Sequence, residues 1–305
     1  MALSLPKGRL KGPTASGRGP FEMTAVLRPS PQGITSLMPK KPKLGQNFLI
    51  DPSASRAIAE ALGDLSHRTV LEIGPGQGAI TELLAARARH LIAVELDHHM
   101  ALHLRVQFAG HSNVEIVEAD ILKLDWGDLP RDDGEKTAVV GNLPYYITSD
   151  ILLRLFSFHA VVGQAVLMVQ REVAERVAAQ PGSSDYGLLS ATTQLYARVE
   201  KLFTLPPSAF SPPPDVYSTV LRLTMRPRFE ELAVDPVGFI SFLRTSFAQK
   251  RKTLANNLRA AGYNSERIAS ALAQSGVEAQ VRSEALPLET AAALYRALRV
   301  SELQS

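Results

Sequence analysis

The sequence predicts an α/β protein with a parallel sheet covered by helices on both faces, followed by a smaller part built only from helices. Short apolar segments alternate with amphipathic ones from about residue 51 to residue 223, which is the pattern of β–α–β units. Beyond Pro227 the apolar residues recur with helical spacing, and no further strand is expected. We therefore divide the chain into three parts, at residues 1–42, 43–226 and 227–305.

The expected elements follow one another in a regular order. Asp51 suits the N-cap and Pro52 the first turn of a helix at 53–62. Apolar runs predict strands at residues 69–73, 90–96, 114–117, 138–140 and 165–170, with a closing pair at 199–205 and 217–223. Helices are expected between them at 97–108, on 151–156 and at 171–179, and another follows residue 78 and ends near 87.

The remaining segments are a loop and the C-terminal helices. Residues 210–216 lie between the closing strands, contain three prolines and are predicted to form a rigid, polyproline-like loop. The C-terminal part is expected to contain helices at 236–247, 251–260, 267–274 and 288–298.

The composition is typical of a soluble globular protein, with 45% hydrophobic and 21% charged residues in a chain of 305. The chain has no Cys, which excludes disulfides and thiolate metal sites and is compatible with a reducing cytosol. No apolar run reaches the length of a membrane-spanning helix. We therefore expect a cytoplasmic protein that does not associate with membranes.

The formal net charge of +3 conceals an uneven distribution. Residues 1–43 contain eight Lys or Arg and one Glu, a charge of +7, whereas the rest contains 25 basic and 29 acidic residues, a charge of −4. Any nucleic-acid site on the folded body must therefore be a local patch. Lys250, Arg251 and Lys252 with Arg259 are the candidates, although a single basic run is more often an exposed helix start.

Residues 1–42 are rich in Pro, Gly and Ser without sustained periodicity, and we expect them to be disordered. A basic arm that grips RNA, an organellar transit peptide and sequence upstream of the true start are three interpretations of this segment. The Pro and Gly content disfavours an amphipathic transit peptide. We favour the third interpretation, with Met38 as the true start.

A glycine loop, Gly74-Pro75-Gly76-Gln77-Gly78, lies between a predicted strand and helix, where glycines let the backbone approach a nucleotide-like ligand. Glu95 closes the next strand and suits ribose hydroxyls, and Asp120 follows the third strand and suits an adenine amino group. The loop alone is a weak signal, and each acid alone also fits a solvated strand end. Together, and without a phosphate-binding Gly-Lys-Ser/Thr loop, they indicate S-adenosylmethionine as the cofactor. The fold that binds it would be a Rossmann-like class I methyltransferase sheet.

Asn142-Leu143-Pro144-Tyr145 follows the strand expected at 138–140. The exocyclic amine of a nucleobase is a poor nucleophile because its lone pair is delocalised into the ring. The Asn142 oxygen and a neighbouring main-chain carbonyl can accept both N–H groups and return the lone pair to nitrogen. Pro144 favours the extended backbone that exposes such a carbonyl, and Tyr145 offers a face on which an extruded base can stack. A lone Asn-x-Pro is usually a turn that ends a strand, but this one accompanies a cofactor motif.

His99 and His103 have the i, i+4 spacing of metal ligands on one predicted helix, beside His98. No third ligand stands out. We therefore interpret the three histidines as a solvated helix face and expect no metal site.

In order and spacing, these motifs resemble those of the small-subunit ribosomal RNA adenine N6-dimethyltransferase family, from about Lys43 to the C-terminus. The matching segments are Leu44-Gly45-Gln46-Asn47-Phe48-Leu49, Glu72-Ile73-Gly74-Pro75-Gly76-Gln77-Gly78, Val94-Glu95-Leu96-Asp97, Ala119-Asp120, Gly141-Asn142-Leu143-Pro144-Tyr145-Tyr146, Phe210-x-Pro212-x-Pro214-x-Val216-x-Ser218 and Gln249-Lys250-Arg251-Lys252-Thr253-Leu254. Residues 1–37 depart from the typical bacterial pattern and receive no transferred role.

The resemblance implies a role for each part of the chain: a catalytic methyltransferase domain at 43–226 and a helical RNA-binding domain at 227–305. The cofactor should be bound by Asn47, Leu49, Gly74, Gly76, Glu95, Asp120 and Asn142. Asn142 and the main-chain carbonyls of Leu143 and Pro144 should hold the target N6. The rings of Tyr145 and Phe210 should stack on opposite faces of the target base.

The implied substrate is a pair of adjacent adenosines in the 3′-terminal hairpin loop of 16S rRNA, within an immature small ribosomal subunit. Each adenosine would be dimethylated by a monomeric enzyme. The reaction needs orientation and desolvation rather than a general base, since the proton can leave after transfer.

Three other functions compete with this one. A large-subunit rRNA methyltransferase shares the Gln-Asn-Phe-Leu opening and the Asn-x-Pro-Tyr turn, although the Lys-Arg-Lys-Thr-Leu segment favours the small-subunit enzyme. A binding or assembly factor could use the same fold without chemistry. A nicotinamide dehydrogenase is disfavoured by the glycine spacing and by the absence of an evident proton-donating His.

Overall fold

The structure is a computed structural model that describes residues 47–129 and 134–300. The predictions for the N-terminal extension, including the interpretation of Met38, fall outside the described residues, as do Leu44, Gly45 and Gln46 of the first motif.

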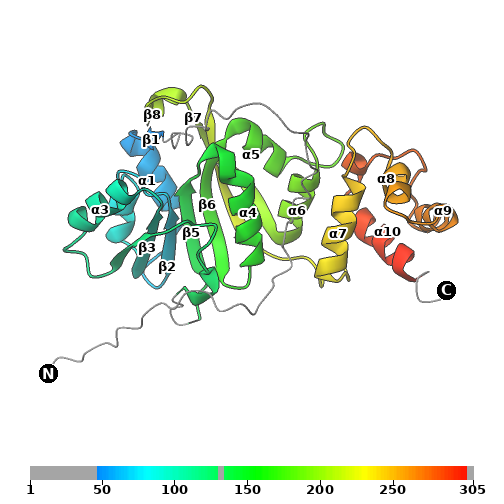
Figure 1. Cartoon of the computed structure of the whole chain (residues 1–305), viewed down its shortest axis with the longest axis horizontal. Coiled ribbons are helices and arrows are strands. Elements are labelled where there is room, and N and C mark those ends of the chain that lie inside the picture. The colour runs from blue at the N-terminus through cyan, green and yellow to red at the C-terminus, as the bar shows by residue number, and fades with distance from the viewer. Residues whose placement is uncertain (1–46, 130–133, 301–305) are drawn as a thin grey trace, which may run out of the picture. The chain divides into compact units, whose positions relative to one another are not determined.

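Within the described ranges, seven strands form one sheet in the order β4-β3-β2-β5-β6-β9-β7 (Figure 1). The strands are β2 (Thr69–Ile73), β3 (His90–Glu95), β4 (Val114–Glu118), β5 (Thr137–Asn142), β6 (Val162–Gln170), β7 (Ala197–Leu205) and β9 (Ser218–Met225). Strands β2 to β6 pair in parallel, and β9 is antiparallel to both of its neighbours, β6 and β7. The predicted fold class is therefore confirmed, with a closing antiparallel pair.

The strand order reverses between β2 and β5. From β2 the chain first adds β3 and β4 on one side, and it then returns to add β5 and β6 on the other. A reversal of this kind opens a crevice at the carboxyl ends of the two central strands, where ligands of open α/β sheets bind. The glycine loop follows β2 and Asn142 ends β5, so both motifs lie at this crevice.

Helices cover the two faces of the sheet. Helices α1 (Pro52–Ala61), α2 (Thr81–Ala85) and α3 (His98–Gln107) contribute to the buried cluster that contains β2 and β5. Helices α4 (Thr148–Ser157), α5 (Arg171–Ala178) and α6 (Leu188–Tyr196) follow the reversal of strand order, and right-handed crossovers then place them on the opposite face. Asp51 caps α1 as predicted, because its Oδ1 accepts from Ser53 N at 2.8 Å and from Ala54 N at 3.2 Å.

A second, two-stranded sheet lies above the crevice. Strand β1 (Phe48–Leu49) lies beside β8 (Phe210–Ser211) (Figure 1) and pairs with it antiparallel. In this register Leu49 lies opposite Phe210. The main chain of Ile50 extends this ladder by donating to Ala209 O at 2.9 Å. The prediction of a polyproline-like loop was wrong for Phe210 and Ser211, because pairing with β1 draws them into a strand.

The C-terminal part contains α7 (Pro236–Ser246), α8 (Leu254–Ala260), α9 (Ser265–Gln274) and α10 (Leu288–Val300), with no strand between residues 226 and 300. Helix α8 begins three residues later than predicted, because Thr253 caps it by accepting from Asn256 N at 3.3 Å. Arg228 forms ion pairs of 2.6 Å with Glu231 and 2.5 Å with Glu289 within this part, and its main-chain N donates to Leu195 O of α6 at 3.0 Å. The described residues belong to one compact unit, and its division into two domains remains our proposal. No helix in the described part of the chain is both long and apolar enough to span a bilayer.

Candidate active site

The crevice at the strand reversal contains the pocket that carries most of the predicted site. It is lined by Asn47, Phe48, Ile73, Gly74, Gly76, Val94, Glu95, Leu96, Ala119, Asp120, Ile121, Asn142, Leu143, Pro144, Tyr145, Tyr146 and Ile147. These residues come from β1 and from the carboxyl ends of four parallel strands. The parallel sheet thus assembles residues that are up to 100 positions apart in the sequence.

The glycine loop needs its glycines for conformation and for space. Gly74 and Gly76 have φ of +66° and +57°, a region that disfavours residues with a Cβ. A Cβ on Gly76 would also lie 3.0 Å from the Phe48 ring, so β1 approaches the loop closely. The loop therefore supplies bare backbone to the pocket, with Phe48 packed against it.

Glu95 is fixed at the base of the pocket by the main chain. Its side chain is buried, Oε2 accepts from Gly76 N at 3.1 Å, and Oε1 accepts from Asp97 N at 2.9 Å. Each carboxylate oxygen can accept a further hydrogen bond. Glu95 is therefore oriented before any ligand binds, with acceptor capacity left for two hydroxyls.

Asp120 lies across the pocket from the glycine loop, at the start of the turn that follows β4. Its Oδ1 accepts from Leu122 N at 3.0 Å, and its Oδ2 lies 3.5 Å from Lys123 Nζ. Its carboxylate is partly exposed and can accept from an amino group in the pocket.

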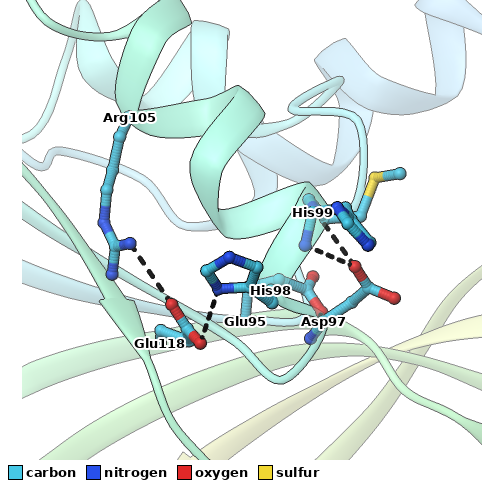
Figure 2. A network of polar contacts seen from close by, with 7 residues as sticks. Glu95, Asp97, His98, His99, Arg105 and Glu118 are labelled. Carbon is cyan, nitrogen blue, oxygen red and sulfur yellow. Dashed lines mark hydrogen bonds and ion pairs between the residues drawn. The ribbon is translucent and has the colours of Figure 1, made fainter.

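His98, at the start of α3, belongs to an exposed polar network (Figure 2), and the main-chain N of His99 donates to Asp97 Oδ1 at 2.8 Å. His98 Nδ1 lies 3.0 Å from Glu118 Oε1, and Arg105 Nη1 lies 3.3 Å from Glu118 Oε2. The hydrogen bond from His98 and the ion pair with Arg105 hold the pKa of the Glu118 carboxyl below its usual value. Among the described residues, no group of three or more His, Asp or Glu side chains could hold a metal ion.

The Asn142 side chain is oriented by the segment that lies over the pocket. Its Nδ2 donates to the main-chain carbonyl of Asn47 at 2.9 Å, which directs Oδ1 away from that contact. No described residue donates to Oδ1. The amide oxygen is therefore available as an acceptor, as chemistry on an exocyclic amine requires.

The two carbonyls of the Leu143-Pro144 turn differ in availability. Pro144 O already accepts from Ile147 N at 3.2 Å and from Thr148 Oγ1 at 3.1 Å. No described residue donates to Leu143 O. Of the two carbonyls predicted to hold the target amine, the structure therefore favours that of Leu143.

Tyr145 lies on the pocket wall and is held by its hydroxyl. Tyr145 Oη lies 3.1 Å from Ser218 Oγ, and Ser218 is completely buried at the start of β9. Because the hydroxyl is tethered in this way, the orientation of the ring is restricted. Ser218 has no role in our sequence predictions, although it ends the proline-loop motif.

Leu49 and Phe210 do not line this pocket. Their side chains are 7% and 3% exposed and belong to the buried cluster under the sheet. Successive side chains of a strand point to opposite faces, so Phe48 faces the pocket while Leu49 faces the core. Phe210 pairs with Leu49 and therefore shares its side. The structure thus does not present Phe210 to a stacked base, in contrast to the prediction.

The predicted RNA-binding residues lie away from this pocket, in the turn between α7 and α8 and on α8. Lys250, Arg251, Lys252 and Arg259 are exposed. Lys250 Nζ donates to Ser184 O at 2.6 Å, so this lysine bridges the helical part and the loop between α5 and α6. The other three side chains remain accessible to phosphate groups.

Glu72 is a buried acid that our sequence predictions did not assign. It lies on β2, two residues before Gly74, and its Oε2 has no hydrogen-bond partner among the described residues. It borders a small cavity beside the pocket, together with Leu49 and Asn142. Burial, with repulsion from Glu95, raises the pKa of the Glu72 carboxyl to about 7.

The sequence matches the profile of the ribosomal RNA adenine dimethylase family over residues 38–299. The chain belongs to this family. It is 63% identical over 258 residues to the ribosomal RNA small subunit methyltransferase A of Acidobacterium capsulatum, which covers 85% of this chain and 91% of that protein. The protein of the same name from Koribacter versatilis is 56% identical over 271 residues, which cover 85% of this chain and 95% of that protein.

Two solved structures share the fold. A dimethyladenosine transferase from Plasmodium falciparum has a TM-score of 0.68 and 26% identity, with coverage of 84% of this chain and 98% of that one. The 23S rRNA methyltransferase ErmE has a TM-score of 0.64 and 29% identity, with coverage of 83% and 100%. As a member of its family, the chain is an rRNA adenine dimethyltransferase that uses S-adenosylmethionine, and an rRNA is its substrate.

The residues of the pocket fit this cofactor. Bare backbone at Gly74 and Gly76 leaves room beside the loop, and the buried carboxylate of Glu95 retains acceptor capacity for a ribose. Leu96 and Ile121 supply apolar surface beside the Asp120 carboxylate, which suits a purine with an amino group. Among the described residues, no basic side chain lines the pocket, as expected for a ligand without phosphates.

Proposed function

We propose that this enzyme dimethylates N6 of two adjacent adenosines in the 3′-terminal hairpin loop of 16S rRNA, in an immature small ribosomal subunit. The observation that carries the proposal is the pair of available acceptors, Asn142 Oδ1 and Leu143 O, in the same pocket as Glu95. The relatives that are 63% and 56% identical are named as small-subunit methyltransferases, which supports the choice of subunit.

The chain's own residues act by holding and orienting. Glu95 and Asp120 hold the ribose and the adenine of the cofactor, and the bound cofactor supplies an electrophilic methyl group. Asn142 Oδ1 and Leu143 O accept the two N6 hydrogens, which concentrates the lone pair on nitrogen and stabilises the positive charge that develops there. Tyr145 supports one face of the base. No described side chain is needed as a base, since the proton leaves after transfer.

The two methylations of one adenosine place different demands on the pocket. The first uses both acceptors, because N6 carries two hydrogens. The monomethylated amine has one hydrogen left, so only one acceptor is used and the other must tolerate a methyl group. The second transfer should therefore depend less on the pair of acceptors than the first does.

The helical part positions the RNA. Arg251, Lys252 and Arg259 are exposed and can bind phosphates, whereas Lys250 is partly engaged with Ser184 O. We propose that the enzyme acts as a cytoplasmic monomer on one subunit at a time. Neutralising Arg251 and Lys252 together should weaken subunit binding and flatten its dependence on salt.

The decisive experiment is methyl transfer from labelled S-adenosylmethionine to undermethylated small subunits, with the modified nucleosides mapped by mass spectrometry. Asn142→Ala should lower the single-turnover rate by about 10²-fold or more, the scale for loss of one preorganised polar group. The unfolding free energy of the variant, measured by chemical denaturation, serves as the control and should change far less.

Other outcomes of the same experiment favour the rival functions. Dimethylation of large-subunit rRNA would favour the reaction named for the structurally similar ErmE. Subunit binding and cofactor binding without methyl transfer would favour an assembly factor.

A further inference from the structure

Exposed apolar side chains gather around the pocket mouth. Among the described residues, eight large apolar side chains are exposed, and five of these lie on the loops at the carboxyl edge of the sheet: Ile50, Leu96, Tyr146, Val216 and Tyr217. Leu96 and Tyr146 line the pocket itself. Val216 and Tyr217 lie outside it and have no role in the proposed function. Exposed apolar side chains at the edge that carries the pocket are candidates for contact with a ligand.

Tyr217 forms a fixed stack with Arg171. The Arg171 guanidinium carbon lies 5.3 Å from the centroid of the Tyr217 ring, and the ring is 47% exposed. Arg171 N donates to Tyr217 O at 2.9 Å, which joins the two main chains. Arg171 Nε also lies 3.6 Å from Glu175 Oε1. These contacts hold the guanidinium over one face of the ring.

The stack adjoins in the chain the residue that contacts Tyr145, at the carboxyl edge of the sheet. Tyr217 directly precedes Ser218, whose Oγ lies 3.1 Å from Tyr145 Oη. Consecutive Cα atoms are about 3.8 Å apart, so the stack begins one residue beyond the contact that holds Tyr145. Ser218 pairs with Gln170, the residue before Arg171, at the edge of the sheet where Asn142 ends β5.

Extruding a base into the pocket leaves its neighbours in the strand without a stacking partner. A tyrosine ring can replace that partner for any base, because every base has a π-face. A guanidinium held over the ring carries N–H donors that suit a phosphate. The Tyr217–Arg171 stack combines both groups on one rigid support.

We infer that the Tyr217–Arg171 stack is a second nucleotide site, which holds the nucleotide beside the target adenosine. The base of that nucleotide stacks on Tyr217, and its phosphate binds Arg171. In a substrate with two adjacent adenosines, this site holds one of them while the other is in the Asn142 pocket. The inference rests on the proposed function, since it requires RNA in that pocket.

The test uses small subunits reconstituted with 16S rRNA that carries a ligated synthetic 3′ segment. Single-turnover kcat/KM is measured with saturating S-adenosylmethionine. Tyr217→Ala and Tyr217→Leu should each lower kcat/KM about tenfold, because both remove the ring, whereas Tyr217→Phe should retain the wild-type value. The kcat/KM of Arg171→Lys should lie between those of the wild type and Tyr217→Ala, since lysine keeps the charge and loses the planar donor set.

Arg198→Gln is the matched control. Arg198 lies on β7, is exposed, and forms an ion pair with Glu200 at 3.2 Å, much as Arg171 does with Glu175. Its kcat/KM should remain at the wild-type value. Cofactor affinity should remain unchanged in every variant.

A second substrate separates stacking from a structural effect. With an abasic residue beside the target adenosine, the kcat/KM of the wild type should fall about tenfold. On this substrate, Tyr217→Ala should have the same kcat/KM as the wild type. Independent, multiplicative losses would overturn the inference, as would a Tyr217→Ala variant with full activity on the normal substrate. A wild type that methylates neither adenosine would overturn the proposed function and the inference with it.

Discussion

At the cofactor end of the pocket, the acceptor oxygens already accept hydrogen bonds from the main chain. At the target end, the acceptor oxygens have no donor among the described residues. Both oxygens of Glu95 accept from backbone N–H groups before any ligand is present. Asn142 Oδ1 and Leu143 O have no described donor, and Phe210 is buried away from the pocket. The acceptors at the cofactor end are therefore oriented before a ligand binds, whereas those at the target end receive their hydrogen bonds from the substrate.

Substitution of Phe210 should have the largest effect, on the unfolding free energy. It tests whether this residue belongs to the core or to the target end of the pocket. Phe210→Ala should cost about 3–5 kcal/mol of unfolding free energy, the range for a buried ring truncated to a methyl group. Phe210→Leu should recover most of this stability, as measured by chemical denaturation, together with the wild-type rate of methyl transfer. A Leu variant that is stable but inactive would show that Phe210 leaves the core to join the target base.

The buried Glu72 lies on β2 beside the cofactor end, and its effect can be tested by measuring the unfolding free energy as a function of pH. Its folded pKa is raised from 4.5 to about 7, so its contribution is fully present below pH 4.5 and is lost as the pH rises through 7. The loss amounts to about 3 kcal/mol. Glu72→Gln cannot ionise, so its unfolding free energy relative to wild type should rise by about that amount over this window. A constant difference between the two proteins across pH 4–8 would contradict a buried, titrating Glu72.

Glu95 tests whether the cofactor end is independent of the target end. Glu95→Gln removes the charge from hydrogen bonds to the ribose, which should weaken cofactor binding by about 1.5–3 kcal/mol, or roughly 10- to 100-fold. Calorimetry of the cofactor measures this directly. The rate at saturating cofactor should stay within a few-fold of wild type. A fall in that rate as large as the loss of affinity would mean that the two ends are not separate.

Ser218 gives the smallest expected effect. Ser218→Ala removes the partner of the Tyr145 hydroxyl, which should cost about 1 kcal/mol, or roughly fivefold in kcat/KM for RNA. Cofactor affinity should not change. Tyr145→Phe should show a similar loss, and the double variant should lose no more than either single one. Additive losses would contradict the proposed tether.

The sequence predicts the regular elements well, and it predicts that Glu95 and Asp120 share a pocket, because both depend on local patterns. The strand expected at 69–73 has those bounds, and Glu95 and Asp120 meet in one pocket because parallel strands share a carboxyl edge. Helix α6 was not predicted, and its segment, Leu188–Tyr196, contains a Thr192-Thr193 pair that weakens a helical prediction.

The remaining differences come from pairing between distant residues. Strands β1 and β8 are each two residues long, and only their mutual pairing defines them. That register decides that Phe48 faces the pocket and that Phe210 faces the core. No spacing within the Phe210 motif contains this information. The availability of Leu143 O, rather than Pro144 O, likewise depends on Thr148, whose hydroxyl contact no residue pattern specifies.

The hydrogen bond from Asn142 to the Asn47 carbonyl joins the residue proposed to hold the methyl acceptor to the segment proposed to bind the methyl donor. A ligand that immobilises Asn47 also restricts Asn142, so donor and acceptor share the entropic cost of ordering this link. Thermodynamic linkage then requires reciprocity: RNA tightens the binding of S-adenosylmethionine by the same factor by which S-adenosylmethionine tightens the binding of RNA.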